Sequence, residues 1–437
     1  MVFDISLRIM KRAVFATALI LICLLFLGFA KVSGQNTGFS PDDIRAAYDV
    51  WPLLNSGYTG KGVTVAVVNT GIDATFYSDV DSFNRIYGLP NASITAVEPF
   101  GSAGTNVESP SGETTGDVEF VHSMAPGAKI LLVLVGSNGN YGGDGFSYVI
   151  SHNAADIATV SPSWAWWGQG AMSTVLSYND EFGSTVDDKI TLIAASNDWG
   201  SNNSVPWGTL TGGFWRDYLP DAYLMPQYSP YVTAVGGTVL TLQSGAYGSE
   251  QGWDRSGGGP SNLFVQPTWQ VGPGVPLNGY RDIPDIALDA SCDTPYAFYW
   301  EGGLGTFCGT SGGAPTFAGI VADIDQAAGG RVGFLNPTLY SLGSSDPSVY
   351  HEITSGCSLV EEGTSTTNGY CAHAGWNFVT GWGSIDAAKL AIHLAPTAHI
   401  VVPEFSVGTP MIFMVALAMV VLLSKRRSLS NRRYAVG

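Results

Sequence analysis

Basic residues are scarce in this sequence of 437 residues, which holds 19 Lys and Arg against 36 Asp and Glu and has a formal net charge of −17. Nine of those 19 lie outside residues 37–396, so the long middle part is markedly acidic. This argues against a nucleic-acid partner, because binding to phosphate backbones depends on clustered positive charge. The hydrophobic share of 45% and the 55 glycines suit one large folded domain with a sizeable core.

None of the histidines lies in a sequence context that a classical Ser-His-Asp peptidase would need. No His-Gly-Thr-His segment occurs. The run Val67 to Ile72 has the form of the subtilisin strand that ends in a catalytic Asp, but Asn69 stands in that place. A Ser-His-Asp triad is therefore poorly supported. The six histidines all lie outside small-residue catalytic contexts: His122, His152, His351, His373, His393 and His399.

Cysteine is sparse, with five in the chain and no Cys-x-x-Cys spacing. Cys23 lies in the apolar run near the start. Pairing the other four as neighbours, Cys292 with Cys308 and Cys357 with Cys371, closes two short loops, each contributing about 3 kcal/mol in the chain-entropy model. A four-cysteine metal site is the alternative, but the missing spacing favours disulfides and an exported protein.

Both ends of the chain carry apolar runs. Residues 1–34 predict a secretory signal peptide, since a basic start precedes an apolar stretch that ends in small residues, and an uncleaved anchor is the alternative. Residues 407–424 predict a membrane-spanning segment. The basic tail over 425–437 then stays in the cytoplasm by the positive-inside rule, and the acidic domain faces outside.

A short motif precedes the second apolar run. The segment Pro403-Glu404-Phe405, with the apolar run and basic tail after it, resembles a sorting signal of archaeal surface proteins, in which the tail is cleaved and replaced by a lipid. This interpretation and a plain membrane anchor are equally supported. In both, residues 397–406 form a linker, and the domain lies at the extracellular face of the cell membrane or is secreted and anchored at the surface.

Between these ends, apolar β-branched runs alternate with segments of helical spacing. This alternation predicts an α/β fold, with a doubly wound parallel sheet, helices on both faces and chemistry at the carboxyl ends of the strands. Residues 238–282, rich in Gly, Ser and Pro, are predicted to form surface loops of the same domain, which spans 38–396. Strands are predicted at 62–69, 129–135, 157–161, 190–196 and 231–235, and helices at 41–54, 145–155 and 169–182.

One serine lies where acyl-transfer chemistry needs a nucleophile. Ser311 follows Gly309-Thr310, and small residues, Pro315 and an apolar run of helical character come after it. Its hydroxyl is expected at a loop-to-helix junction, where backbone N–H groups have no partner within the helix. A plain helix cap is the alternative unless a base and an oxyanion donor lie nearby.

Carboxyl groups are the candidates for both of those roles. Glu113 and Asp117 are four residues apart, so on a helix both lie on one face. Two carboxyls held so close tend to share a proton, whereas a solvated acidic face is the alternative. Asp198 follows the strand predicted at 190–196 and supplies a further carboxyl at a strand end.

These segments together resemble the sedolisin family, the serine-carboxyl peptidases with a subtilisin-like fold. The resemblance runs from about Phe39 to Leu394, and the order and spacing of its short motifs carry the specificity. The motifs are Tyr87-Gly88-Leu89-Pro90, the Glu113 and Asp117 pair, Ser161-Pro162-Ser163-Trp164, Ala195-Ser196-Asn197-Asp198-Trp199-Gly200, Pro284-Asp285-Ile286-Ala287, Gly309-Thr310-Ser311 and Thr380-Gly381-Trp382-Gly383.

The resemblance implies a role for each candidate. Ser311 is expected to be the nucleophile, Glu113 the general base and Asp117 the residue that orients Glu113. Asp198 is expected to donate a hydrogen bond in the oxyanion hole while protonated, so the chemistry belongs in acid. Asn197 stands where the family has Gly, which leaves Asn197 as an alternative donor, although the spacing to Gly200 favours Asp198.

The family also implies one structural Ca²⁺ near the C-terminus. Asn377 stands where the family has an Asp, so one negative charge is missing and a weak calcium site or none is expected. The corresponding residues are Glu352, Ile353, His373, Gly375 and Asn377, with the first and last as side-chain ligands and the others as carbonyl ligands.

The whole sequence predicts a monomeric acid endopeptidase that acts on protein or peptide substrates outside the membrane. Two other hypotheses remain open: a catalytically silent surface protein that uses the same fold for binding, and a conventional subtilisin-type serine peptidase. The intact set of Ser311, Glu113, Asp117 and Asp198 argues against the first. The unsuitable histidine contexts argue against the second.

Overall fold

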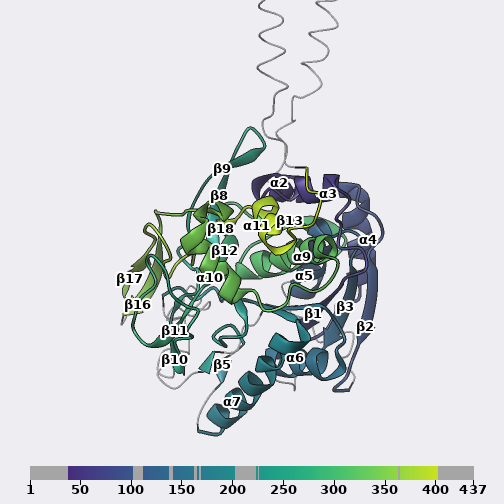
Figure 1. Ribbon diagram of the computed structural model, residues 1–437. Helices are drawn as coiled ribbons and strands as arrows, with labels where there is room; N and C mark the ends of the chain where they lie inside the picture. The colour runs from purple at the N-terminus through teal and green to yellow at the C-terminus, as the bar shows by residue number, and fades with distance from the viewer. Residues whose placement is uncertain are drawn as a thin grey trace, which may run out of the picture. The chain divides into compact units, whose positions relative to one another are not determined.

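Seven parallel strands form the centre of the structure, in the order β12-β8-β6-β4-β1-β3-β2, and β9 (Ala246–Gly252) adds antiparallel to β8 (Figure 1). The predicted doubly wound α/β fold is confirmed. The parallel strands are β1 (Thr64–Asn69), β2 (Ser93–Val97), β3 (Lys129–Leu134), β4 (Ile157–Val160), β6 (Thr191–Ala195), β8 (Thr233–Gln243) and β12 (Ile286–Asp289).

This arrangement comes from a computed structural model. It describes residues 38–101, 112–136, 141–161, 165–166, 169–201, 223–224, 226–362 and 365–401. All of these belong to one unit that begins at Gly38.

Strand β1 explains why the apolar runs become buried strands. Val65 and Val67 belong to one hydrophobic cluster, and Ala66 and Val68 belong to another, so alternate side chains face opposite sides of the sheet. All four are fully buried. A strand covered on both faces needs apolar residues at every position, which is the pattern seen in the sequence.

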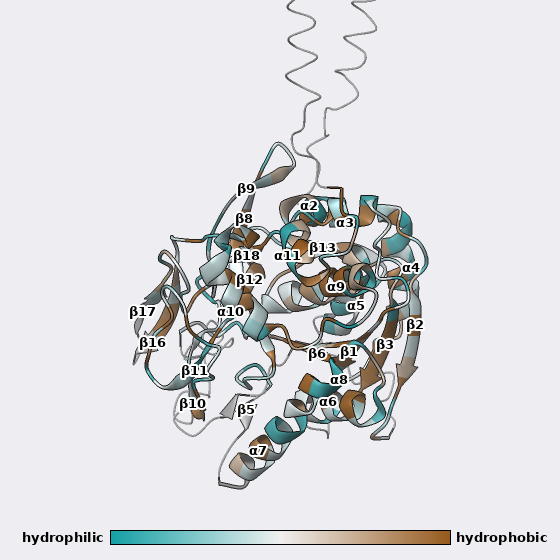
Figure 2. Ribbon diagram, viewed as in Figure 1, coloured by the Kyte–Doolittle hydropathy of each residue, from teal (hydrophilic) through white to brown (hydrophobic). Residues whose placement is uncertain are grey.

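Helices cover both faces of the sheet. Helices α5 and α9 contribute to the cluster on one face, and α6 and α7 contribute to the cluster on the other. Hydrophobic colour follows the central strands in Figure 2, whereas α2 and α4 carry much hydrophilic colour. The helices of the described residues are α2 (Pro41–Ala47), α3 (Trp51–Asn55), α4 (Phe76–Tyr87), α5 (Glu113–Met124), α6 (Tyr141–His152), α7 (Gln169–Gly183), α8 (Thr185–Asp188), α9 (Thr310–Ala328), α10 (Asn336–Ser345) and α11 (Ala387–Leu394).

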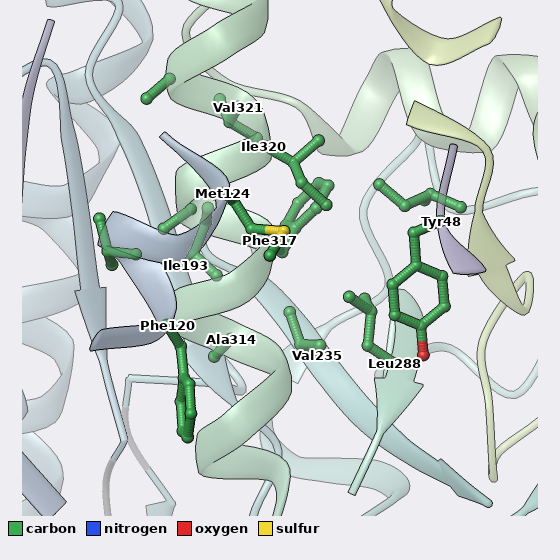
Figure 3. Close-up of a cluster of buried hydrophobic side chains, with 14 of the residues drawn as sticks. Tyr48, Phe120, Met124, Ile193, Val235, Leu288, Ala314, Phe317, Ile320 and Val321 are labelled. Atoms are coloured by element: carbon green, nitrogen blue, oxygen red, sulfur yellow. The ribbon is translucent and has the colours of Figure 1, made fainter. Parts of the chain in front are cut away.

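The packing of α5 against α9 is what positions the candidate site. Phe120 and Met124 of α5 lie in one cluster with Phe317 of α9 (Figure 3). Gly319 allows the close approach, since a Cβ there would lie 2.7 Å from both the Met124 Cβ and the Val121 carbonyl oxygen. The two helices are thereby held together, and their first turns carry the candidate base and nucleophile.

The helix predicted over 41–54 is in fact two helices. Helix α2 begins with a capping box, in which Ser40 Oγ accepts from the Asp43 N–H at 3.3 Å and Asp43 Oδ2 accepts from the Ser40 N–H at 3.0 Å. Helix α3 begins only at Trp51, after Asp49 adopts a left-handed φ of 52°. Such a residue interrupts a helix, and the apolar spacing continues across the break without revealing it.

The prediction of surface loops at 238–282 is wrong. Strand β8 runs on to Gln243, and a further hairpin pairs β10 (Gly259–Val265) with β11 (Tyr280–Ile283). The end of this region is core, because Arg281 and Asp282 are 0% exposed. Gly, Ser and Pro are depleted in most strands, so a composition rich in them concealed these short ones.

Both predicted disulfides are present. The Cys292–Cys308 bond closes the loop that contains β13 and β14, just before α9, and the Cys357–Cys371 bond joins β16 to β17. The remaining strands are β5 (Ala165–Trp166), β7 (Tyr223–Leu224), β13 (Tyr296–Trp300), β14 (Gly303–Phe307), β15 (Tyr350–His351), β16 (Cys357–Glu362), β17 (Ser365–Cys371) and β18 (Ser384–Ile385).

The predicted terminal segments are not part of this description. The signal peptide at 1–34, the Pro403-Glu404-Phe405 motif, the apolar segment at 407–424 and the basic tail lie outside the described residues. Among the helices that are described, none combines the length and the apolar character needed to cross a bilayer.

Candidate active site

Ser311 is the second residue of α9 and lies just after the disulfide-linked hairpin. Gly309, which precedes the helix, has a φ of 117°, and a Cβ at this position would lie 2.5 Å from Asp198 Oδ2. The Ser311 side chain is half-buried, in a first helical turn whose N–H groups have no partner within the helix. The predicted loop-to-helix junction is confirmed.

Glu113 approaches Ser311 from the first turn of α5. The hydroxyl groups of Ser311 and Ser161 lie near enough to its carboxyl group to influence its pKa. Burial raises the pKa of Glu113, against the lowering effect of these two hydroxyls. A buried carboxyl with a raised pKa beside a serine hydroxyl has the proton affinity that a general base needs.

Asp117 lies one turn further along α5 and is 1% exposed. Its Oδ1 accepts from Ser161 Oγ at 3.0 Å, and its Oδ2 accepts from Asn69 Nδ2 at 3.2 Å. Burial, and next the charge of Glu113, raise the pKa of Asp117 well above the usual carboxyl value. The two carboxyls therefore hold their protons as a pair and titrate together.

Sequence reasoning did not find that Asn69 and Ser161 hold Asp117. Asn69 ends β1, and Ser161 follows β4, the strand next to it. The Thr70 N–H donates to Asn69 Oδ1 at 2.8 Å, which leaves Nδ2 to face Asp117. An Asp at position 69 would add a third carboxyl and remove this donor. The available signal was their common place at the carboxyl ends of adjacent parallel strands.

Asp198 follows β6 and reaches the residue directly before Ser311. Its Oδ1 accepts from both the N–H and the Oγ1 of Thr310, each at 2.8 Å. Burial raises the pKa of Asp198, while the two Thr310 hydrogen bonds and then the charge of Arg255 lower it. A carboxyl that keeps its proton in acid, next to a nucleophile, can donate a hydrogen bond to an oxyanion.

Asn197 occupies a left-handed backbone position, with a φ of 83°. This conformation explains why the sedolisin pattern has Gly there. The Asn197 carbonyl accepts from the Gly257 N–H at 2.8 Å, and its side chain is buried. Within the described residues, no hydrogen bond joins the Asn197 side chain to α9, whereas Asp198 makes two. The geometry therefore favours Asp198 as the donor.

The β13–β14 hairpin stands beside the base. Its Trp300 ring packs on Gly112, the residue before α5, where a Cβ would lie 2.8 Å from the indole Cγ. Trp300 Nε1 donates to Asp73 Oδ2 at 3.0 Å, and the Gly302 N–H donates to Asp79 Oδ1 at 3.1 Å. Two carboxyls thus hold a half-buried aromatic residue next to the helix start that carries the base.

No histidine takes part in this site. His122 lies buried on α5, and its Nε2 is 2.8 Å from the Pro90 carbonyl oxygen. His351 is hydrogen-bonded to Ser384, which is 0% exposed and therefore closed to a substrate. Across the described part of the chain, which includes all six histidines, none is hydrogen-bonded to Ser311. The subtilisin-type hypothesis lacks its base.

The residues expected to hold Ca²⁺ do come together, but their donors do not fit a cation. Glu352 Oε1 accepts from the Gly375 N–H at 2.9 Å. Asn377 Nδ2 donates to the carbonyls of Ile353 and His373, at 3.5 and 3.3 Å. In the described ranges, no three His, Cys, Asp or Glu side chains are grouped as a metal site. An amide N–H points at the oxygens that the ion would need.

Comparison with known proteins agrees with this geometry. The model of the Subtilase family matches residues 60–383. Sedolisin of Pseudomonas sp. (strain 101) is 29% identical over 385 residues, covering 83% of this chain and 62% of the relative. Kumamolisin of Bacillus sp. (strain MN-32) is 30% identical over 386 residues, covering 84% and 65%. The chain thus spans somewhat less than two thirds of the length of these relatives.

A solved structure extends the similarity to the fold. Pseudomonas sedolisin, a serine-carboxyl proteinase complexed with two molecules of pseudo-iodotyrostatin, matches with a TM-score of 0.70 and 29% identity, covering 84% of this chain and 100% of that one. The sequence motifs, the clustered carboxyls and these matches agree. The chain belongs to the subtilase family and, within it, to the sedolisin family of serine-carboxyl peptidases.

Proposed function

We propose that this protein hydrolyses peptide bonds in acid through a Ser-Glu-Asp triad, with Ser311 as nucleophile, Glu113 as general base and Asp117 as the residue that orients the base. The observation that carries the proposal is that carboxyl groups from two elements approach the start of α9, where Ser311 lies. Glu113 reaches Ser311 from α5, and Asp198 is hydrogen-bonded to the neighbouring Thr310. We expect the protein to act as an endopeptidase, with proteins or peptides as substrates.

The first half-reaction forms an acyl-enzyme. Ser311 Oγ attacks the carbonyl carbon of the scissile bond while its proton passes to Glu113. The oxyanion that forms accepts hydrogen bonds from protonated Asp198 and from the Ser311 N–H, in the first turn of α9. Such a preorganised donor contributes about 3 kcal/mol. Collapse of the intermediate then breaks the C–N bond, and the leaving amine takes the proton from Glu113.

The second half-reaction releases the acid product. Water attacks the acyl carbon and gives a proton to Glu113, and the same donors stabilise the second oxyanion. When this intermediate collapses, Ser311 Oγ leaves and recovers its proton from Glu113. Asp117 holds the Glu113 carboxyl in place throughout, itself held by the Asn69 amide and the Ser161 hydroxyl.

The carboxyl groups set opposite limits on pH. The coupled Glu113 and Asp117 must carry a negative charge, so activity falls as the pH drops below the pKa of the pair. Asp198 must stay protonated, so activity falls as the pH rises through its pKa. Because burial raises the pKa of all three, both limits lie above the usual carboxyl value of about 4. A bell-shaped profile follows.

The proposal includes the organisation of the chain. Residues 1–34 act as a signal peptide, 38–396 as the peptidase domain, 397–406 as a linker, 407–424 as a membrane or sorting segment and 425–437 as a cytoplasmic tail. The domain works as a monomer at the outer face of the membrane. The two disulfides support export, because such bonds persist in oxidising compartments.

The direct test is digestion of a denatured protein by the full chain and by Ser311→Ala, from about pH 3 to pH 7. We expect turnover by the natural chain and none by Ser311→Ala. Ser345→Ala, which removes an exposed hydroxyl on α10, is the matched control and should stay active. Equal activity of Ser311→Ala would refute the assignment, and a folded natural chain without activity would favour the silent binding protein.

A further inference from the structure

An amide lies at the centre of the predicted calcium site and satisfies the groups that an ion would hold. We propose that the Asn377 side chain replaces the cation, so that the C-terminal part of the domain is held by hydrogen bonds and needs no metal. The proposal concerns the residues between Glu352 and Thr380, which come from the loop after β15 and the loop after β17. It is independent of the proposed catalytic chemistry.

The oxygen of the Asn377 amide fixes its orientation. Oδ1 accepts from the Val379 N–H at 3.0 Å, from the Thr380 N–H at 3.0 Å and from the Thr380 hydroxyl at 3.1 Å. Turning the amide over would place its NH₂ group against two backbone N–H donors, and two donors cannot bond to each other. Nδ2 is therefore the atom on the other side.

That nitrogen faces carbonyls that the sedolisin pattern assigns to Ca²⁺. Nδ2 lies 3.3 Å from the His373 carbonyl oxygen and 3.5 Å from the Ile353 carbonyl oxygen. A calcium ligand must offer a lone pair about 2.3–2.6 Å from the ion, whereas an amide nitrogen offers hydrogens. A cation at this place would lose one ligand and meet N–H groups. The protein's own donor fills the position.

Glu352 does not restore the missing ligand. Its Oε1 accepts from the Gly375 N–H at 2.9 Å, and the residue is exposed, whereas Asn377 is 1% exposed. A single exposed carboxylate that already accepts a backbone hydrogen bond offers little to a divalent ion, because calcium sites rely on several charged oxygens. Both side chains therefore close this cluster by hydrogen bonds.

The cluster is linked to the loop that carries Asp198. The Val379 carbonyl accepts from Ser256 Oγ at 2.7 Å. The next residue, Gly257, donates its N–H to the Asn197 carbonyl at 2.8 Å. A change at Asn377 is therefore expected to act on the stability of the fold first, and through this chain of contacts on the oxyanion side of the active site.

The variant Asn377→Asp tests the proposal, because it exchanges the donor for an acceptor and recreates the family's ligand. In the full chain with a chelator, carboxylate and carbonyl oxygens would then face one another, and we expect the melting temperature to fall by about 3 °C or more. Millimolar CaCl₂ should restore it by binding the folded state. The natural chain should melt at the same temperature in chelator and in CaCl₂.

Controls separate this effect from a simple change of charge. Asn55→Asp adds the same charge at an exposed residue and should show neither the loss nor the rescue. An unresponsive Asn377→Asp, or a natural chain stabilised by CaCl₂ but not by MgCl₂, would overturn the proposal. If Asn377→Asp does not fold, the proposal is tested by the melting temperatures of the natural chain and of Glu352→Gln in chelator and in CaCl₂. Glu352→Gln keeps an acceptor for Gly375, so its melting temperature should be equal in chelator and CaCl₂, and a calcium response in either protein would show a bound ion.

Discussion

Two of the buried carboxyl groups in this protein have opposite surroundings. Asp285 is 0% exposed and is paired with Arg281, with Nη1 donating to Oδ1 at 2.7 Å and Nη2 donating to Oδ2 at 2.6 Å. Asp117 is buried as deeply, but it receives only a hydroxyl and an amide and has the Glu113 carboxyl beside it. One carboxyl has a cation and the other has a second acid.

The difference decides what each group can do. The bidentate ion pair ties Arg281 of β11 to the residue directly before β12. A buried carboxyl that has only neutral donors, and another carboxyl next to it, has a raised pKa, because its charged form is poorly stabilised. Among the described residues no cation is paired with Asp117, and the proposed acid–base role of the Glu113 and Asp117 pair depends on this.

The largest expected effect concerns the base. Glu113→Gln should lower turnover by about 10⁴-fold or more, because an amide cannot take the proton of Ser311. Glu119→Gln makes the same exchange at another buried position of α5 and should stay close to the natural activity. Initial rates on one peptide substrate measure both. If His122→Ala were as damaging as Glu113→Gln, the subtilisin-type hypothesis would gain.

The next prediction compares the two buried carboxyls directly. Asp285→Asn removes the charge that compensates Arg281 and should cost about 3–5 kcal/mol of unfolding free energy. Asp117→Asn should change stability by only about 1 kcal/mol, since no cation loses a partner, while it lowers turnover by about 10²-fold or more. Denaturant unfolding and initial rates measure the two effects. Equal losses of stability would mean that Asp117 is as structural as Asp285.

A smaller effect concerns pH and stability. Burial raises the pKa of Asp49 and Asp282 to about 6 and that of Asp325 to about 7. Since these folded values lie above the unfolded value of about 4, the stability they confer is complete below that pH and is lost as the pH rises through 6 to 7. The melting temperature of Ser311→Ala should therefore fall by several degrees from pH 4 to pH 7.

Asp323 sharpens this pH prediction. It is 0% exposed, burial raises its pKa well above the usual value, and neither of its carboxyl oxygens has a hydrogen-bond partner among the described residues. In the Ser311→Ala background, Asp323→Asn replaces this carboxyl by a group that does not titrate. The fall in melting temperature between pH 4 and pH 7 should therefore be smaller. A melting temperature that rises with pH in the parent would contradict the account.

Much of the fold could be predicted because its strands are buried on both faces. The runs at 62–69, 129–135 and 190–196 became β1, β3 and β6 with boundaries shifted by two residues or fewer. Ser311 could be placed at the start of α9 because small residues and a helical apolar run mark a helix start locally. These features depend on neighbours in sequence, so the sequence reveals them.

Features that depend on distant neighbours could not be predicted. The Asn69 amide donates to Asp117, 48 residues away, and no residue near Asn69 in the sequence indicates this contact. The anchoring of Asp198 by Thr310 spans 112 residues. The sequence suggested Asn377 as a calcium ligand, whereas in the fold its side-chain nitrogen is a hydrogen-bond donor. This orientation depends on the Val379 and Thr380 N–H groups, which meet the amide oxygen only in the folded chain. The residue types were enough to name candidate site residues. Their hydrogen-bond partners became known only from the tertiary structure.

Asp198 is the residue at which a serine-carboxyl peptidase and a conventional serine peptidase differ most. In the present account a neutral Asp198 donates to the oxyanion, and its ionisation removes that donor and places a charge against a developing negative charge. Asp198→Asn keeps a donor of similar size that does not titrate. Asp198→Ala should lower activity by about 10²-fold or more at pH values where Asp198 is protonated in the natural chain, and Asn197→Ala should be mild.

The role of Asp198 is tested most directly by the pH profile of kcat/KM for the natural chain and Asp198→Asn on one peptide substrate. We expect a steep loss of activity on the alkaline side for the natural chain. For Asp198→Asn we expect a lower maximum, with a larger fraction of activity surviving toward neutral pH. An alkaline limb that is unchanged in Asp198→Asn would contradict the assignment of Asp198 as the protonated oxyanion donor.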